Sequence, residues 1–194
     1  MAWADGALIG AETLRRHGST CLIHAPDLLS RRAQERRSPQ PIAVVVSRTG
    51  AFAPSLPFFA QPLDRWLLLA APCWREGPRP PGFARCLPLG GWEATLQALA
   101  ASGLRRLVVL GGAALAGSLL AEGRMDELQL TLCPLLLGGG HTWLAPDLSP
   151  AAGLGTGWRL LEHRSLGGEE LLLHYGRTDR GEGSPEEPSL AGGA

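Results

Sequence analysis

The sequence has no excess of charge of either sign, because 18 Lys and Arg residues balance 18 Asp and Glu residues. It also lacks an apolar run near the roughly 18 residues of a membrane-spanning helix, and it shows no signal peptide. A balanced charge gives no support for a nucleic-acid or polyanion partner. We therefore expect neither a nucleic-acid nor a membrane partner, and 194 residues favour one domain with or without a tail.

Cysteine is scarce, and no motif accompanies the four thiols. They form no CxxC pair, and none stands beside a histidine at metal-ligand spacing. The five histidines are scattered, so we expect no metal site. We interpret Cys133 as a buried thiol, because it lies in an apolar run. A reducing cytoplasm fits these four residues best: Cys21, Cys73, Cys86 and Cys133.

Basic residues cluster at one place in the chain. We interpret this cluster as a solvated face or loop in preference to a functional patch. It consists of Arg31, Arg32, Arg36 and Arg37.

Buried strands and amphipathic helices alternate along most of the chain. The apolar runs predict strands at 4–10, 41–48, 65–72, 104–112 and 126–140, and the 3.6-residue spacing predicts helices at 92–103 and 113–123. Residues 11–16 resemble the start of a helix or a turn. This order predicts an α/β fold of three layers (α/β/α) with a mostly parallel, mixed sheet.

The last structured part of the chain reads as an antiparallel hairpin. Two alternating runs, 158–167 and 169–177, are separated by the turn residues Gly167 and Gly168. Residues 178–194 lack any core pattern, so we expect a disordered tail there.

Gly111 and Gly112 are the last two residues of the predicted strand at 104–112, directly before the predicted helix. Such a turn, with bare amides at a helix amino end, can hold phosphate oxygens. The pattern is nonetheless neither GxGxxG nor GxxxxGK[ST]. The spacing alone leaves two readings open, a phosphate site and an ordinary structural corner.

Two further strand ends carry groups that could bind a cofactor. Ser47 and Arg48 leave the strand at 41–48, where a hydroxyl and a guanidinium could hold a phosphate monoester. Gly10 ends the first strand, and Thr13 follows one turn later. For both places a purely structural role, a solvated strand end or a helix cap, stays open.

Three blocks of this sequence resemble a known family. "ADGALIGAETLR", "QPIAVVVSRTG" and "LVVLGGAALAGSLLAEGRMDELQLTLCPLLLGGG" are similar, in this order, to the reductase domain of the bifunctional riboflavin deaminase–reductase. That is the RibD C-terminal domain, which has a dihydrofolate-reductase-like fold. The resemblance covers roughly residues 4–176 and predicts a reductase domain over 1–177.

The resemblance implies a reductase that uses NADPH. Members of the family move a hydride to the ribosyl carbon of 5-amino-6-(5-phosphoribosylamino)uracil and form the ribitylamino product. The cofactor supplies the reactivity, so no catalytic side chain is assigned. A cytoplasmic homodimer is expected. The positions that match cofactor-binding residues are Gly10, Thr13, Ser47, Arg48, Thr49, Gly111, Gly112, Ala113, Ala114, Leu115 and Ala116.

The substrate half of the pattern departs from the family. Leu110 stands where the family commonly has a substrate-binding Glu, and His24 stands roughly where it has a phosphate-binding Arg. His17 and Gly18 replace an Asp pair. The family's opening strand, with its Ser-Leu-Asp-Gly turn, has no counterpart in the sequence, and without it a neighbouring strand would expose its edge. These departures leave two alternatives, a same-fold reductase of another pteridine-like substrate and a truncated, non-catalytic nucleotide-binding relative.

Overall fold

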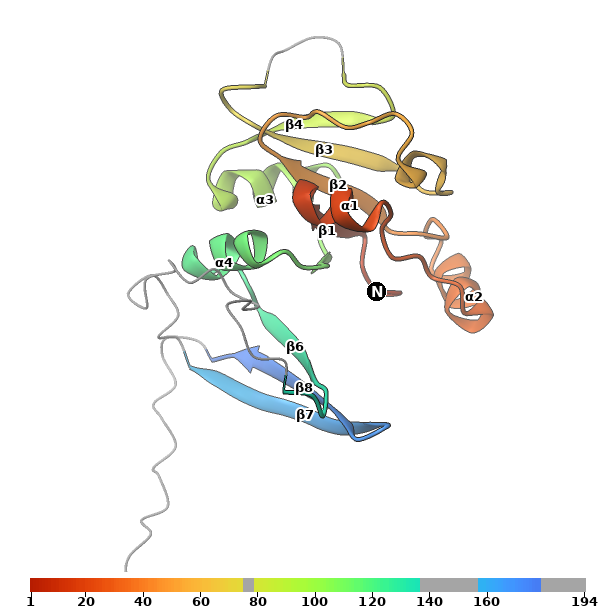
Figure 1. Ribbon diagram of the computed structural model, residues 1–194, viewed down its shortest axis with the longest axis vertical. Coiled ribbons are helices and arrows are strands. Elements are labelled where there is room, and N and C mark those ends of the chain that lie inside the picture. The colour runs from red at the N-terminus through yellow and green to blue at the C-terminus, as the bar shows by residue number, and fades with distance from the viewer. Residues whose placement is uncertain (75–78, 137–156, 179–194) are drawn as a thin grey trace, which may run out of the picture.

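A parallel sheet of five strands forms the larger part of the protein (Figure 1). The structure, a computed structural model, describes residues 1–74, 79–136 and 157–178. The strand order is β4-β3-β2-β1-β5, and every pairing is parallel. The strands are β1 (Gly6–Gly10), β2 (Ile42–Ser47), β3 (Arg65–Ala70), β4 (Arg85–Leu89) and β5 (Leu107–Val109).

Helices cover both faces of this sheet, which gives the three layers that the sequence predicts. Side chains alternate between two cores, because neighbours along a strand point to opposite faces. Leu8 and Leu68 pack with residues of α3 and α4, whereas Ile9 and Leu67 pack with α1 and η1. The helices are α1 (Ala11–His17), α2 (Pro26–Gln34), η1 (Pro57–Ala60), α3 (Trp92–Ala101) and α4 (Ala113–Ala121).

A second, antiparallel sheet has the order β6-β8-β7. The predicted hairpin is confirmed as β7 (Trp158–Gly167) and β8 (Glu170–Arg177), and β6 (Glu127–Leu132) pairs with β8. The order of elements in the sequence predicts one mixed sheet, but the described strands form two sheets. β5 pairs only with β1 and β6 only with β8, so each keeps one open edge among the described strands.

Three elements were not predicted from the sequence: α2, η1 and β4. Helix α2 begins at Pro26, which suits the first helical position, but five of its nine residues are polar or charged, so no long apolar run indicates it. Strand β4 contains Pro88, which argues against a central strand. The structure places β4 at the sheet edge, where proline is tolerated because one side of the strand needs no backbone donor.

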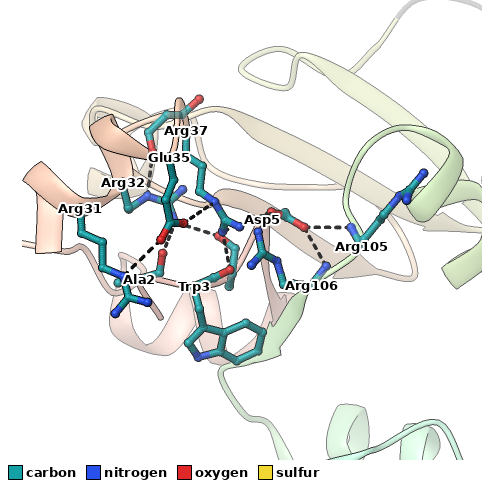
Figure 2. A network of polar contacts seen from close by, with 11 residues as sticks. Ala2, Trp3, Asp5, Arg31, Arg32, Glu35, Arg37, Arg105 and Arg106 are labelled. Carbon is teal, nitrogen blue, oxygen red and sulfur yellow. Dashed lines mark hydrogen bonds and ion pairs between the residues drawn. The ribbon is translucent and has the colours of Figure 1, made fainter.

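Arg32 of the basic cluster is buried, so the interpretation of this cluster as a solvated face is wrong for that residue. Arg32 is 2% exposed and donates to the carbonyl oxygens of Ser38, Ala2 and Ala4 at 2.7, 2.7 and 2.8 Å (Figure 2). Arg37 donates to the carbonyl of Trp3. We call Arg32 and Arg37 the arginine clamp, since together they fix residues 2–4 against the amino end of β1.

Asp5 joins the arginine clamp to the next strand of the sheet. Its carboxylate pairs with Arg37 at 3.4 Å and accepts the backbone N–H groups of Arg105 and Arg106 at 3.1 and 2.8 Å (Figure 2). Burial lowers the pKa of Arg32, and the negative charges of Asp5 and Glu35 act in the opposite direction. The clamp therefore holds structure, and it offers no free basic patch at Arg32.

Two predictions for the C-terminal part of the chain have different outcomes. Cys133 is exposed, so the prediction of a buried thiol is wrong: it follows the last residue of β6, Leu132, which is itself 53% exposed. The predicted tail, 178–194, lies outside the described residues except for Thr178. That residue donates two hydrogen bonds to the carbonyl oxygen of Gly157, from its N–H at 2.9 Å and from its hydroxyl at 2.7 Å.

Candidate functional site

Three strands carry the predicted cofactor residues to one edge of the larger sheet. Strands β2, β1 and β5 are parallel neighbours, so their carboxyl ends lie side by side. Gly10 is the register partner of Val46, next to Ser47, and the N–H of Leu110 donates to the carbonyl of Leu8 at 2.9 Å. Three segments far apart in the sequence thus meet here, at 10–13, 47–49 and 110–116.

The glycine pair lies at the beginning of α4. Gly111 and Gly112 have φ angles of 100° and 97°, which L-residues with a side chain rarely adopt. A Cβ atom on Gly112 would lie 2.9 Å from the Thr13 hydroxyl, so this glycine also allows α1 and α4 to approach closely. A Cβ atom on Gly111 would meet no atom within 4 Å. Gly112 thus has a packing role, whereas open space lies beside Gly111.

The start of α4 has free amides but little room for side-chain recognition. No side chain caps this helix, and its first backbone bond runs from the N–H of Ala116 to the carbonyl of Gly112. The amides that precede Ala116 have no acceptor within the helix. Leu115 is 6% exposed and packs in the core, so only its backbone can face a ligand.

The turn after β2 presents one charged side chain. Ser47 is 3% exposed, and its hydroxyl accepts the N–H of Gly50 at 3.0 Å, which makes it a turn-forming residue. The Thr49 hydroxyl likewise accepts the N–H of Ala51, at 3.4 Å. Arg48 is exposed, and among the described residues it has no recorded hydrogen bond or ion pair. Of the three residues, only Arg48 therefore has a side chain ready to hold an anion.

A cavity of about 510 Å³ opens beside this edge, lined by residues of β1, α1, the segment that follows α1 and the end of β5. It brings together Thr13 and the three residues matched to substrate contacts, Leu110, His17 and His24. Its described lining contains no Asp, Glu, Lys or Arg, so hydroxyl, imidazole and amide groups supply its polarity. Its full lining is Ile9, Thr13, His17, Ser19, Thr20, Cys21, Leu22, His24, Gln61 and Leu110.

One wall of the cavity is held in place by two glutamine side chains. The amide of Gln61 accepts from the N–H of Thr20 at 2.9 Å and donates to its carbonyl at 2.8 Å. Gln40 makes the same pair of bonds with Ile23, both at 2.8 Å. Each glutamine amide thus satisfies the backbone N–H and carbonyl of one residue, as a neighbouring strand would, in a segment without regular secondary structure.

Sequence reasoning missed Thr20 and Gln61. Both line the cavity, and Thr20 is buried. No motif links them, because they lie 41 positions apart and meet through a side chain–backbone contact. The one available signal was local: Thr20 stands between His17 and His24, which the resemblance had already assigned to the substrate.

The fold and this cavity together define a class of protein. After β1 the chain builds β2, β3 and β4 on one side and then crosses to β5 on the other, so β1 and β5 flank the point where the strand order reverses. Open α/β sheets bind small molecules at such a point, beside the carboxyl ends of the strands. The chain has the architecture of an open α/β protein with a cavity at this point of the sheet.

Sequence comparison names the family within this class. The chain belongs to the RibD C-terminal domain family, whose profile matches residues 1–172. No curated protein matches the chain by sequence.

Solved structures share the fold at low sequence identity. A pyrimidine reductase-like protein from Corynebacterium diphtheriae has 19% identity and a TM-score of 0.65, with 91% of this chain and 77% of that chain covered. A diaminohydroxyphosphoribosylaminopyrimidine deaminase/5-amino-6-(5-phosphoribosylamino)uracil reductase from Thermotoga maritima has 16% identity and a TM-score of 0.71, with 91% and 46% covered. Acinetobacter baumannii RibD has 19% identity and a TM-score of 0.69, with 90% and 47% covered. This chain therefore spans less than half of the last two proteins.

The described ranges contain neither a metal-ligating cluster nor a membrane-spanning helix. Over residues 1–74, 79–136 and 157–178, no group of three or more His, Cys, Asp or Glu residues could hold a metal ion. No helix in the same ranges is long and apolar enough to cross a membrane.

Proposed function

We propose that this chain is an NADPH-dependent reductase acting on 5-amino-6-(5-phosphoribosylamino)uracil. One observation carries the proposal: the free amides of α4, the exposed Arg48 and the cavity with His17 and His24 lie at the same sheet edge, in a chain of the RibD C-terminal domain family. The solved relatives that are reductases by name support the reaction type.

The residues at this edge fit a dinucleotide phosphate. Open space lies beside Gly111, where a ligand can approach the backbone, and the amides before Ala116 would hold the diphosphate. Arg48 would bind the 2′-phosphate that distinguishes NADPH from NADH. Gly10, Ser47 and Thr49 would shape the backbone, since the Ser47 and Thr49 hydroxyls already accept turn amides.

Hydride transfer requires few acid–base side chains from the protein, because the cofactor carries the reactivity. When bound, NADPH would supply the hydride. The chain would orient the acceptor carbon and exclude water, for which Ile9, Leu22 and Leu110 supply apolar lining of the cavity. The polar lining residues, among them His17, Ser19 and His24, would contact the phosphoribosyl group.

Three broader features belong to the same proposal. Among the described strands, β5 and β6 each keep one open edge, at which a further strand would pair. The exposed leucines of the smaller sheet support a homodimer, and four free thiols support a reducing cytoplasm. Light scattering of the purified protein checks the dimer.

The test is a titration of the purified protein with NADPH and NADH, followed by nicotinamide fluorescence. We expect NADPH to bind more tightly than NADH. Arg48→Ala is expected to weaken NADPH about 10-fold or more and to leave NADH nearly unchanged, because a charge-assisted bond is lost for one cofactor only. Arg164→Ala, at an exposed position of β7, is the matched control and should change neither. Equal weakening of both cofactors by Arg48→Ala would show that the 2′-phosphate lies elsewhere.

Turnover separates this proposal from a second candidate. Leu110 lines the cavity where the family commonly has Glu, which favours a same-fold reductase of another pteridine-like substrate. NADPH oxidation with the phosphoribosylamino-pyrimidine would support the first function. Oxidation with a pteridine alone would support the second, and NADPH binding without turnover of either would identify a non-catalytic relative.

A further inference from the structure

The hydroxyl of Thr20 is buried without a hydrogen-bond partner. Among the described residues, no other buried side-chain nitrogen or oxygen atom lacks one. Thr20 is 9% exposed and lies on the cavity wall. An unpaired buried hydroxyl weakens a fold, and valine has nearly the same shape without this cost. The presence of the hydroxyl therefore calls for a reason outside the fold.

The backbone around Thr20 is fully engaged. Its N–H and carbonyl both bond to the side-chain amide of Gln61. The backbone carbonyl of Gln61 accepts a hydrogen bond from the Arg65 guanidinium. Arg65 also donates to the carbonyl of Phe58 at 3.1 Å, and the N–H of Phe58 donates to Gly18 at 2.8 Å. This chain of bonds runs from β3 to the cavity wall, so rotation about the Cα–Cβ bond of Thr20 redirects its hydroxyl while the wall stays fixed.

A second buried threonine, away from the cavity, behaves differently. Thr95 is 3% exposed, and its hydroxyl donates to the carbonyl of Gly91 at 3.0 Å. It lies in α3 and packs on the opposite side of the sheet from α1. Among the described residues, the fold thus satisfies the buried hydroxyl of Thr95, away from this cavity, and leaves that of Thr20, on the cavity wall, without a partner.

We propose that the Thr20 hydroxyl is a specificity-determining partner for the sugar phosphate portion of the ligand in this cavity. Gln61 is the positioning residue that holds Thr20 there. Other polar groups that line the same cavity, those of Thr13, Ser19 and His17, suit hydroxyl and phosphate oxygens. The assignment of a sugar phosphate to this cavity rests on the proposed function, whereas the unpaired hydroxyl and its anchoring do not.

The experiment uses the full chain and ribose 5-phosphate as the probe. Calorimetry gives its Kd for the wild type and for Thr20→Val, Thr20→Ser and Thr95→Val, and thermal unfolding gives the Tm of each without ligand. Thr20→Val should raise Kd about 10-fold and leave Tm unchanged or higher, whereas Thr20→Ser keeps the hydroxyl and should stay within about 3-fold of the wild type. Thr95→Val should lower Tm and leave Kd unchanged.

Gln61 is tested through the same probe. Gln61→Leu should raise Kd by about as much as Thr20→Val, and the double variant should bind no more weakly than either single variant, because both changes remove the same contact. In steady-state turnover of the pyrimidine, Thr20→Val should raise KM about 10-fold and change kcat less than 2-fold. A purely structural role would not produce this split between KM and kcat.

Two results would overturn the inference. One is a wild-type chain that does not bind ribose 5-phosphate. The other is an unchanged Kd in Thr20→Val with a Tm that falls as in Thr95→Val, which would give the hydroxyl a structural role. Sugar phosphate binding that depends on Thr20, in a chain that binds no NADPH, would instead refute the reductase proposal and support the inference.

Discussion

The five-stranded and the three-stranded sheet differ in how their apolar side chains are covered. Every buried residue in the described ranges lies between Ala4 and Leu120, in the larger sheet, its helices and the segments that connect them. On β7 of the smaller sheet, three leucines stay between 45% and 46% exposed. They are Leu160, Leu161 and Leu166.

Layering explains the difference. The larger sheet has helices on both faces, so its strands read as continuous apolar runs, as expected of a buried parallel sheet. The smaller sheet has alternating sequences but no core of its own among the described residues. Alternation predicts strands correctly, yet it does not determine what covers their apolar face.

The largest expected effect comes from truncating the core of the larger sheet. Leu68 of β3 is fully buried, so Leu68→Ala should lower the free energy of unfolding by about 3 kcal/mol, through lost burial and a cavity. Leu166→Ala, at a position 45% exposed, should lower it by less than about 1 kcal/mol. Urea unfolding measures both. Equal losses would show that the smaller sheet is as well covered as the larger one, and the comparison would fail.

The next largest effect concerns the arginine clamp. Arg32→Ala removes three hydrogen bonds to backbone carbonyls and should cost about 2 to 4 kcal/mol, because buried acceptors lose their donor. Arg31→Ala removes only an exposed ion pair with Glu35, at 3.2 Å, and should cost less than about 0.5 kcal/mol. The same urea experiment separates them. A small loss for Arg32→Ala would mean that residues 2–4 contribute little to the larger sheet.

The smallest effect separates two thiols, Cys133 just after β6 and Cys86 on β4. The neighbouring Glu170 carboxylate raises the pKa of exposed Cys133, whereas burial raises the pKa of Cys86 on β4. A raised thiol pKa means less thiolate and slower alkylation at a given pH. Glu170→Gln should therefore speed iodoacetamide labelling of Cys133 about 2- to 5-fold at pH 8.

Cys86 is the internal control for this labelling. Its rate should not respond to Glu170→Gln, and it should rise when low urea loosens the larger sheet. Site-resolved mass spectrometry follows both thiols in one sample. If Cys86 accelerated as much as Cys133 on Glu170→Gln, the variant would have disturbed the fold instead of one charge.

Much of the candidate site could be predicted, because its residues follow strand ends. The register of parallel strands then brings Thr13, Arg48 and Gly111 to one edge without further information. The role of Ser47 could not be read in this way, since the same residue type serves a turn or a ligand. Only the structure showed that its hydroxyl accepts the N–H of Gly50.

Contacts between distant segments were beyond the sequence. Arg32 belongs to a basic run that indicates a solvated face, but its helix places it beside the carbonyls of Ala2 and Ala4. Gln61 and Thr20 are paired by the path of the loop before β3. A side chain that binds a backbone many positions away leaves no periodic signal.

The sequence by itself determined most of the strands and helices, the two-faced burial of the larger sheet and the glycine turn before α4, because these follow from local spacing and backbone conformation. Only the tertiary structure decided the separation into two sheets, the burial of Arg32 and the cavity wall held by Gln40 and Gln61. Each of these depends on long-range partners, and the free energy of a polar group is set by the partner it finds.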